Sequence, residues 1–212
     1  MGVLVEICVD SVETAQLALA AGADRLELCA DLSVGGLTPS ESLFEQVSSI
    51  SNVPVFVMIR CRSGDFIYAD NEKQQMLSDA LKLLRAGASG FVSGALTLID
   101  GEHDIDVPFM KELVHLVSPL PVTFHKAIDR VGDAISRFSL LSDIGVMRIL
   151  TSGTSQFAED GVSVLKRMVE LGKPVVIVAG GVRAHNLIDL IEKTCCFEIH
   201  SRSPEICDII KK

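Results

Sequence analysis

Long apolar runs are missing from the sequence, since none approaches the ~20 consecutive apolar residues that a membrane-spanning helix needs. The amino terminus also lacks the basic start and the cleavage site of a secretory signal peptide. We therefore expect a cytoplasmic protein with no membrane partner.

Positive charge is scarce relative to negative charge. The 212 residues include 19 lysines and arginines against 28 aspartates and glutamates, which gives a net charge of −9 and an isoelectric point near 5.0. A nucleic-acid-binding protein needs a basic face that meets the phosphate backbone. The composition therefore argues against a nucleic-acid partner.

Paired-cysteine signatures are absent as well. The six cysteines include no CxxC pair and are accompanied by no secretory signal. We therefore expect free thiols, of which a subset can serve metal binding or redox chemistry. Cys195 and Cys196 are adjacent in the sequence, and adjacent cysteines rarely form a comfortable disulfide.

Linker-like, proline-rich and low-complexity segments are absent, so no change in composition divides the chain. Apolar residues make up 48% of the sequence and the mean hydropathy is +0.39, which suits a large core. We expect residues 1–212 to form one domain.

A short pattern occurs twice near the amino terminus. The first copy is Glu6-Ile7-Cys8-Val9-Asp10 and the second is Glu27-Leu28-Cys29-Ala30-Asp31, separated by a segment of helical composition that Gly22 ends. Side chains alternate between the two faces of a strand, so each copy places its glutamate and its cysteine on one face. If the two strands are parallel neighbours, both thiols point into the same space.

Eight such strand–helix units follow one another along the chain. The expected strands cover residues 3–9, 25–29, 55–59, 90–93, 121–125, 147–150, 174–178 and 197–200. This alternation predicts a parallel α/β sheet, either a (β/α)8 barrel of the TIM type or an open doubly wound sheet.

Two features favour the barrel over the open sheet. No G-x-G-x-x-G motif follows the first strand. One face of the strands also carries charged residues, which an open sheet covered by helices disfavours. We expect these side chains to face the barrel lumen and to form one connected polar network; they are Glu6, Arg25, Glu27, Arg60, His125, Arg148 and His200.

Several segments, taken together, resemble the CutC family of copper homeostasis proteins over nearly the whole chain. Besides the repeated Glu-x-Cys pattern they are Gly35-Gly36-Leu37-Thr38-Pro39-Ser40, Ile59-Arg60-Cys61-Arg62-Ser63-Gly64-Asp65-Phe66, Thr123-Phe124-His125-Lys126-Ala127-Ile128-Asp129, Arg148-Ile149-Leu150-Thr151-Ser152-Gly153 and His200-Ser201. The resemblance implies a barrel of this kind, a cytosolic location and Cu(I) handling through the two strand-end cysteines. Cys61 departs from the family pattern, which usually has proline there.

Thiolates are soft donors that suit Cu(I), and neighbouring parallel strands lie roughly 4.8 Å apart. We therefore predict one Cu(I) per chain, with Cys8 and Cys29 as its principal ligands and Cys61 as a candidate third ligand. The alternative for both strand-end cysteines is an inert place in the core, where free cysteine is common.

An unrecognised barrel enzyme that acts on a small anionic substrate, a phosphate or a carboxylate, is the competing function. Its acid–base candidates are Glu6, Glu27, His125 and Asp129. Its candidate anion-binding residues, at the barrel end where active sites form, are Arg25, Arg60, Arg62, Asp65, Ser152, Gly153, Gly180, Gly181 and His200. Salt bridges among these groups would equally explain the charges.

Only twelve residues follow the eighth expected strand, so the last helix should be about two turns long, whereas barrel helices usually run three or more. We therefore expect the outer faces of the first and last strands, around Val3, Val5, Phe197 and Ile199, to be partly uncovered. An exposed apolar strip of this kind usually marks an interface, which predicts a homodimer packed at this seam.

Overall fold

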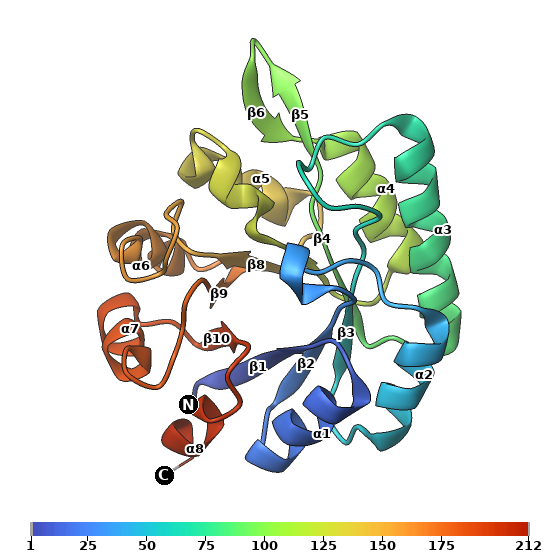
Figure 1. The fold of residues 1–212 in the computed structure, drawn as a ribbon. Coiled ribbons are helices and arrows are strands. Elements are labelled where there is room, and N and C mark those ends of the chain that lie inside the picture. The colour runs from blue at the N-terminus through green and yellow to red at the C-terminus, as the bar shows by residue number, and fades with distance from the viewer. Residues whose placement is uncertain (1, 212) are drawn as a thin grey trace.

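The computed structural model describes residues 2–211, whose strands close into a barrel with the helices arranged around it (Figure 1). Around the barrel the parallel strands follow the order β1, β2, β3, β4, β7, β8, β9 and β10, which pairs again with β1. Parallel strands joined by crossover helices define the (β/α)8 fold. The predicted barrel is therefore confirmed, and the open sheet is excluded by the pairing of β1 with β10.

The barrel strands end within one residue of the predicted positions. They are β1 (Leu4–Val9), β2 (Arg25–Leu28), β3 (Val55–Met58), β4 (Gly90–Ser93), β7 (Val122–Phe124), β8 (Arg148–Thr151), β9 (Val175–Val178) and β10 (Glu198–Ser201). The helices are α1 (Val12–Ala21), η1 (Leu32–Val34), α2 (Glu41–Ile50), α3 (Asp70–Ala86), α4 (Val107–Val117), η2 (Lys126–Arg130), α5 (Ala134–Asp143), α6 (Val162–Leu171), α7 (Leu187–Thr194) and α8 (Ile206–Ile210).

A hairpin interrupts the alternation after β4 and projects beyond the ring of helices in Figure 1. It consists of β5 (Leu96–Ile99) and β6 (Glu102–Ile105), which pair antiparallel. The two residues of its turn, Asp100 and Gly101, have φ values of 52° and 84°. Two successive positive φ values are what a tight hairpin turn needs, and Asp-Gly is a preferred pair for it.

The apolar core is divided into separate clusters because strand side chains alternate between the two faces. Val5 and Ile7 belong to the large cluster between strands and helices and are fully buried. Smaller clusters separate from it include the one formed by Cys8, Cys29, Phe56, Met58 and Val92. The two strand-end cysteines thus lie apart from the main core.

The shortened last helix is confirmed, since α8 has five residues. The predicted seam is covered in part: Val5 and Ile199 are 0% exposed, and Ile206 of α8 is buried as well, whereas Val3 is half-buried. Phe197, which immediately precedes β10, remains 58% exposed. The exposed side chain of Phe197 leaves a smaller apolar patch at the seam, and the homodimer stays a prediction.

Across residues 2–211, the structure contains no helix whose length and apolar character would let it traverse a bilayer.

Candidate functional site

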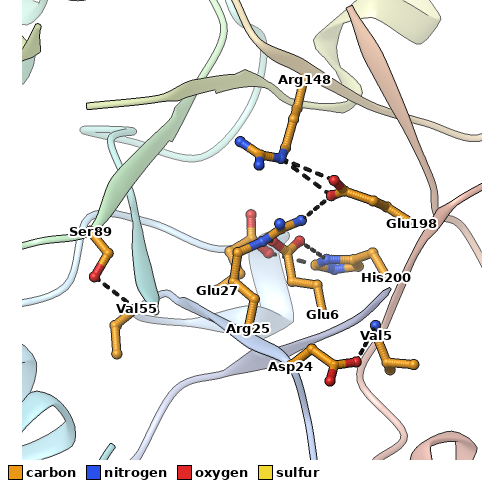
Figure 2. Close-up of polar contacts among 10 residues, drawn as sticks. All are labelled: Val5, Glu6, Asp24, Arg25, Glu27, Val55, Ser89, Arg148, Glu198 and His200. Atoms are coloured by element: carbon orange, nitrogen blue, oxygen red, sulfur yellow. Dashed lines mark hydrogen bonds and ion pairs between the residues drawn. The ribbon is translucent and has the colours of Figure 1, made fainter. Parts of the chain in front are cut away.

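A buried polar network occupies the barrel lumen (Figure 2). Glu6 is 0% exposed and stands in register opposite Arg25 on one side and His200 on the other. The Nε group of Arg25 donates to Glu6, and Nη2 of Arg25 donates to Glu198 at 2.5 Å. Arg148 donates to the same Glu198 carboxylate at 3.3 Å. Unpaired buried charges are costly, so each guanidinium here has a carboxylate partner.

An aromatic ring supports both guanidinium groups of this network. The guanidinium carbons of Arg25 and Arg148 lie 4.9 Å and 5.4 Å from the centre of the Phe56 ring, within the range of cation–π contact. A Cβ on Gly90 of the next strand would lie 2.6 Å from that ring. Glycine at position 90 therefore makes room for Phe56 to fill the lumen.

Arg60 and His125 stand outside the network, so the prediction of one connected set is wrong for them. The guanidinium of Arg60 donates to main-chain carbonyls in residues 34–36 and at Gly64. Nδ1 of His125 accepts the N–H of Ala127 at 3.2 Å. Both residues lie at or just past a strand end, where loop carbonyls and amides compete with lumen side chains as partners.

The sulfur atoms of Cys8 and Cys29 are 3.8 Å apart. Both side chains are buried and both are free thiols. Gly36 packs directly against Cys29, because a Cβ at Gly36 would lie 2.9 Å from that sulfur. The shared space that strand alternation predicted for the two thiols is thus present.

Two further donor groups adjoin this thiol pair. Ligand atoms of Cys8, Glu27 and His200 all lie within 4.8 Å of one another, a spacing that one metal ion could span. Nδ1 of His200 is hydrogen-bonded to Glu6 at 2.7 Å, and its Nε2 lies 3.5 Å from Glu27. A histidine oriented by a carboxylate is typical of metal ligands.

Cys61 does not join this group. It lines a separate surface hollow together with Thr38 and Asp79. The strand ends before residue 59, so the alternation of β3 no longer fixes the direction of this side chain. The structure therefore offers Glu27 and His200, rather than Cys61, beside the thiol pair.

Both strand-end thiols are held in their protonated form. The hydrogen bond with Cys29, burial and the nearby Glu27 raise the pKa of Cys8 well above the usual range. The bond to Cys8 lowers the pKa of Cys29, but burial and the charge of Glu27 outweigh it, so this pKa is also raised. A metal ion that binds here must therefore displace protons.

The two glutamates of the cluster differ in their acid–base character. Burial favours neutral Glu6, yet Arg25 and His200 lower its pKa to about 2. Burial raises the pKa of Glu27, against the opposing charge of His200. Burial lowers the pKa of His200, but Glu27, Cys8 and Glu6 together raise it well above its usual value. Glu6 is therefore a fixed anion, and Glu27 is the carboxyl that more readily takes up a proton.

A cavity of about 530 Å³, which we call the mouth cavity, lies over the carboxyl ends of the strands, and Cys8, Glu27 and His200 form part of its wall. Its other charged lining residues are Arg60, Lys126, Arg130, Arg183 and Arg202. Among residues 2–211, one carboxylate thus lines the mouth cavity against five arginines and lysines. The whole sequence has the opposite ratio, 28 acids to 19 such bases.

Four of the predicted anion-binding residues line the mouth cavity: Arg60, Gly180, Gly181 and His200. Arg25 is instead enclosed in the lumen network. Sequence reasoning missed Lys126, Arg130, Arg183 and Arg202. Basic residues shortly after the carboxyl ends of strands were the available signal.

The remaining predicted residues are engaged elsewhere. Arg62 is paired with Asp65 and Glu72 at the surface, which is the self-neutralised arrangement that the sequence left open. Ser152 donates to Asp129, whose carboxylate also accepts N–H groups from Ser152 and Thr154. Asp129 therefore orders the loop after β8, and neither it nor Gly153 lines the mouth cavity.

These features define a class of protein: a (β/α)8 barrel with a Cys–Glu–His cluster of metal-ligand type beneath a basic mouth cavity. The model of the CutC family matches residues 3–204. The chain therefore belongs to the CutC family, as the resemblance of its motifs indicated.

Known relatives agree with this assignment. The human copper homeostasis protein cutC homolog is 44% identical over 201 residues, which cover 94% of this chain and 72% of the relative. The family protein CutC of Aliivibrio fischeri (strain MJ11) is 39% identical over 204 residues, 94% of this chain and 81% of the relative.

Solved structures extend the comparison to the fold. A CutC structure from Streptococcus agalactiae has a TM-score of 0.88 at 29% identity and covers 95% of this chain and 99% of that one. A 2,3-dimethylmalate lyase has a TM-score of 0.66 at 15% identity, over 99% of this chain and 77% of the enzyme, and so shares the fold alone.

Proposed function

We propose that the chain serves copper homeostasis by binding one Cu(I) between Cys8 and Cys29. The observation that carries this proposal is the sulfur–sulfur distance of 3.8 Å. Zinc–sulfur bonds in proteins are about 2.3 Å long, and at a comparable distance one Cu(I) ion could contact both sulfurs without a change in the backbone. Thiolates select Cu(I) over the harder cations that carboxylates prefer.

His200 and Glu27 are the further donors that could complete the site. The bond from His200 to Glu6 fixes the imidazole so that its Nε2 lies toward Glu27. His200 would have to release its proton before it could bind the metal. Cu(I) binding would thus release protons from the two thiols and from any histidine that joins them.

A cytosolic location is part of this proposal. The six cysteines are free thiols, although Cys8 and Cys29 lie close together. Reducing compartments keep such thiols available, whereas oxidising compartments favour disulfides. The copper homeostasis names of the relatives also support the role.

A competition titration of reduced, oxygen-free protein against a chromophoric Cu(I) chelator tests the binding site. We expect one Cu(I) per chain and an affinity that falls by at least about 100-fold in Cys8→Ser and in Cys29→Ser. Cys195→Ser removes an exposed thiol and serves as the matched control. Unchanged affinity in the Cys8→Ser/Cys29→Ser protein would contradict the proposal.

An enzyme or carrier that binds a small anion is the second candidate function. The basic wall of the mouth cavity favours it, because a metal store alone does not need five arginines and lysines there. Glu27 supplies the acid–base candidate, whereas Asp129 is committed to its loop. A crystal structure with ligands soaked in distinguishes the two: a soft metal between the thiols favours the first, and an ordered anion among the basic side chains favours the second.

A further inference from the structure

We propose that the mouth cavity binds the phosphate group of a small phosphorylated molecule at the loops after β9 and β10. The binding groups are the N–H groups of Gly180, Gly181 and Val182 and the side chains of Lys126, Arg183 and Arg202. This inference rests on the second candidate function and names its ligand class.

Three successive N–H groups in the loop after β9 lack a partner. Gly180 and Gly181 both have positive φ values, 97° and 75°. Within residues 2–211, the N–H groups of Gly180, Gly181 and Val182 donate to no acceptor, although Val182 is 1% exposed. Buried backbone donors are almost always satisfied, so the N–H of Val182 calls for an acceptor from a ligand or from water, and the N–H groups of the half-buried Gly180 and Gly181 are free to join it.

A basic side chain lies over the same loop. A Cβ on Gly180 would be 3.2 Å from the ammonium nitrogen of Lys126. The nearest carboxylate to this ammonium belongs to Asp129, at 3.9 Å. Most of the hydrogen-bonding capacity of Lys126 is therefore free for an anion placed over Gly180.

Two arginines are oriented but not neutralised. Arg183 donates to the carbonyl of Val182 at 2.7 Å, and Arg202 donates to the carbonyl of Leu32 at 2.6 Å. In the described part of the chain, neither guanidinium has a carboxylate within 4.0 Å. Carbonyl anchors hold the side chains in place without cancelling their charge, which leaves donors for a bidentate anion contact.

The number of donors favours phosphate over a single carboxylate. Three backbone N–H groups and three cationic side chains exceed what two carboxylate oxygens accept, whereas a phosphate offers three terminal oxygens and up to two charges. Loops after the seventh and eighth strands are also where TIM-type barrels commonly hold phosphate. In this chain those strands are β9 and β10.

The size of the mouth cavity argues for an organic phosphate. Its volume of about 530 Å³ falls in the range of small-molecule sites and exceeds the need of a bare ion. Apolar side chains, including Met58, Leu150 and Phe157, line the remainder. We therefore infer a phosphorylated molecule with a small organic body.

Amide NMR spectra of the reduced, metal-free, full-length chain test this site with inorganic phosphate at low ionic strength. We expect saturable shifts of the Gly180, Gly181 and Val182 amides. In Arg183→Gln/Arg202→Gln the dissociation constant should rise by about tenfold or more, as expected for lost charge-assisted bonds. The matched control is Arg167→Gln/Lys193→Gln, two exposed side chains on α6 and α7, which should leave the constant within about twofold.

Malonate is titrated in parallel as a dicarboxylate probe. Unmoved amides with millimolar phosphate, or equal weakening in the control variant, would overturn the phosphate site. Malonate binding in the absence of phosphate binding would overturn the phosphate class while leaving an anionic ligand in place. Failure of both probes would remove the second candidate function as well, and the Cu(I) titration would still stand as the separate test of the first.

Discussion

The sulfur atoms of Cys8 and Cys29 lie 3.8 Å apart, although 21 positions separate the two residues in the chain. Cys8 belongs to β1, and Cys29 immediately follows β2. Strand pairing sets Cys8 opposite Glu27 rather than opposite Cys29. The contact therefore also depends on the loop after β2, where Gly36 packs against the Cys29 sulfur.

Gly36→Ala should weaken Cu(I) binding without removing a donor atom. The new Cβ would lie 2.9 Å from the sulfur of Cys29, so the thiol has to move. We expect a loss of about tenfold or more in Cu(I) affinity, since misplacement of a ligand costs on this order. The competition titration with a chromophoric chelator measures it.

Gly87→Ala is the matched control for this change. Both glycines have φ values in the left-handed region, 90° at Gly36 and 100° at Gly87, but a Cβ on Gly87 meets open space. Backbone strain is thus similar in the two variants, and only one of them displaces the thiol. Equal Cu(I) affinities in the two variants would contradict the importance of the loop contact.

Arg25→Met should be strongly destabilising. Arg25 pairs with both Glu6 and Glu198, and its side chain is 3% exposed. Removing one partner of a buried ion pair leaves uncompensated charge and typically costs about 3–5 kcal/mol. We expect a loss of this size in the free energy of unfolding by denaturant titration.

Arg62→Met provides the comparison for a surface pair. Arg62 also contacts two carboxylates, but its side chain is 35% exposed. Such pairs contribute about 1 kcal/mol or less. If the two arginine variants lose similar amounts of unfolding free energy, the buried lumen network stabilises the fold no more than a surface ion pair does.

His125 should make the protein sensitive to mild acid. Burial and the charge of Arg60 lower the pKa of His125 to about 3 from 6.5. Between these values the unfolded chain binds a proton that the folded chain does not, so stability is lost as the pH falls through this window. Between pH 7 and pH 5 the free energy of unfolding should fall by about 2 kcal/mol because of this residue.

The difference in the free energy of unfolding between wild type and His125→Asn, measured as a function of pH, isolates the contribution of His125. Asparagine can still accept the Ala127 N–H that Nδ1 of His125 accepts, but it does not titrate. His200 has a raised pKa and the opposite pH dependence, and it cancels because both proteins contain it. A pH-independent difference in the free energy of unfolding between pH 5 and pH 7 would contradict the lowered pKa.

Light scattering at micromolar concentration tests the proposed homodimer. Exposed apolar side chains on the segments next to β1 and β10 in the chain are Leu17 on α1, Ile188 on α7 and Phe197, which are 64%, 47% and 58% exposed. We expect a dimer that Phe197→Asp converts to a monomer, because a buried unpaired charge is costly. Leu98→Asp, on the projecting hairpin, is the control. A wild-type monomer, or a dimer disrupted only by Leu98→Asp, would refute this interface.

Strand alternation was sufficient to predict which side chains enter the lumen. Glu6 and Cys8 share one face of β1, and the structure places both inside the barrel. The rule fails past the strand ends, as at Cys61 and Arg60, because loop side chains take their direction from long-range contacts. Arg60 binds carbonyls from residues 34–36, which no local pattern in the sequence indicates.

The cation cluster of the mouth cavity illustrates the same limit. Lys126 of η2, Arg183 and Arg202 come from three separate segments that follow β7, β9 and β10, and they converge only when the barrel closes. Each of them follows a strand in the chain, but their common cavity depends on strand order and loop shape. Gly180 and Gly181 were found from sequence because glycine pairs at strand ends are a local signal.

Copper K-edge X-ray absorption of the reduced chain loaded with one Cu(I) counts the sulfur atoms bound to the metal. Binding between Cys8 and Cys29 predicts two sulfur atoms in the first coordination shell of copper in wild type. The spectrum of copper-loaded Cys8→Ser should show one bound sulfur fewer than wild type, and that of Cys195→Ser should show the same number. An unchanged sulfur shell in the Cys8→Ser/Cys29→Ser protein, or no sulfur around copper in wild type, would contradict the proposed site.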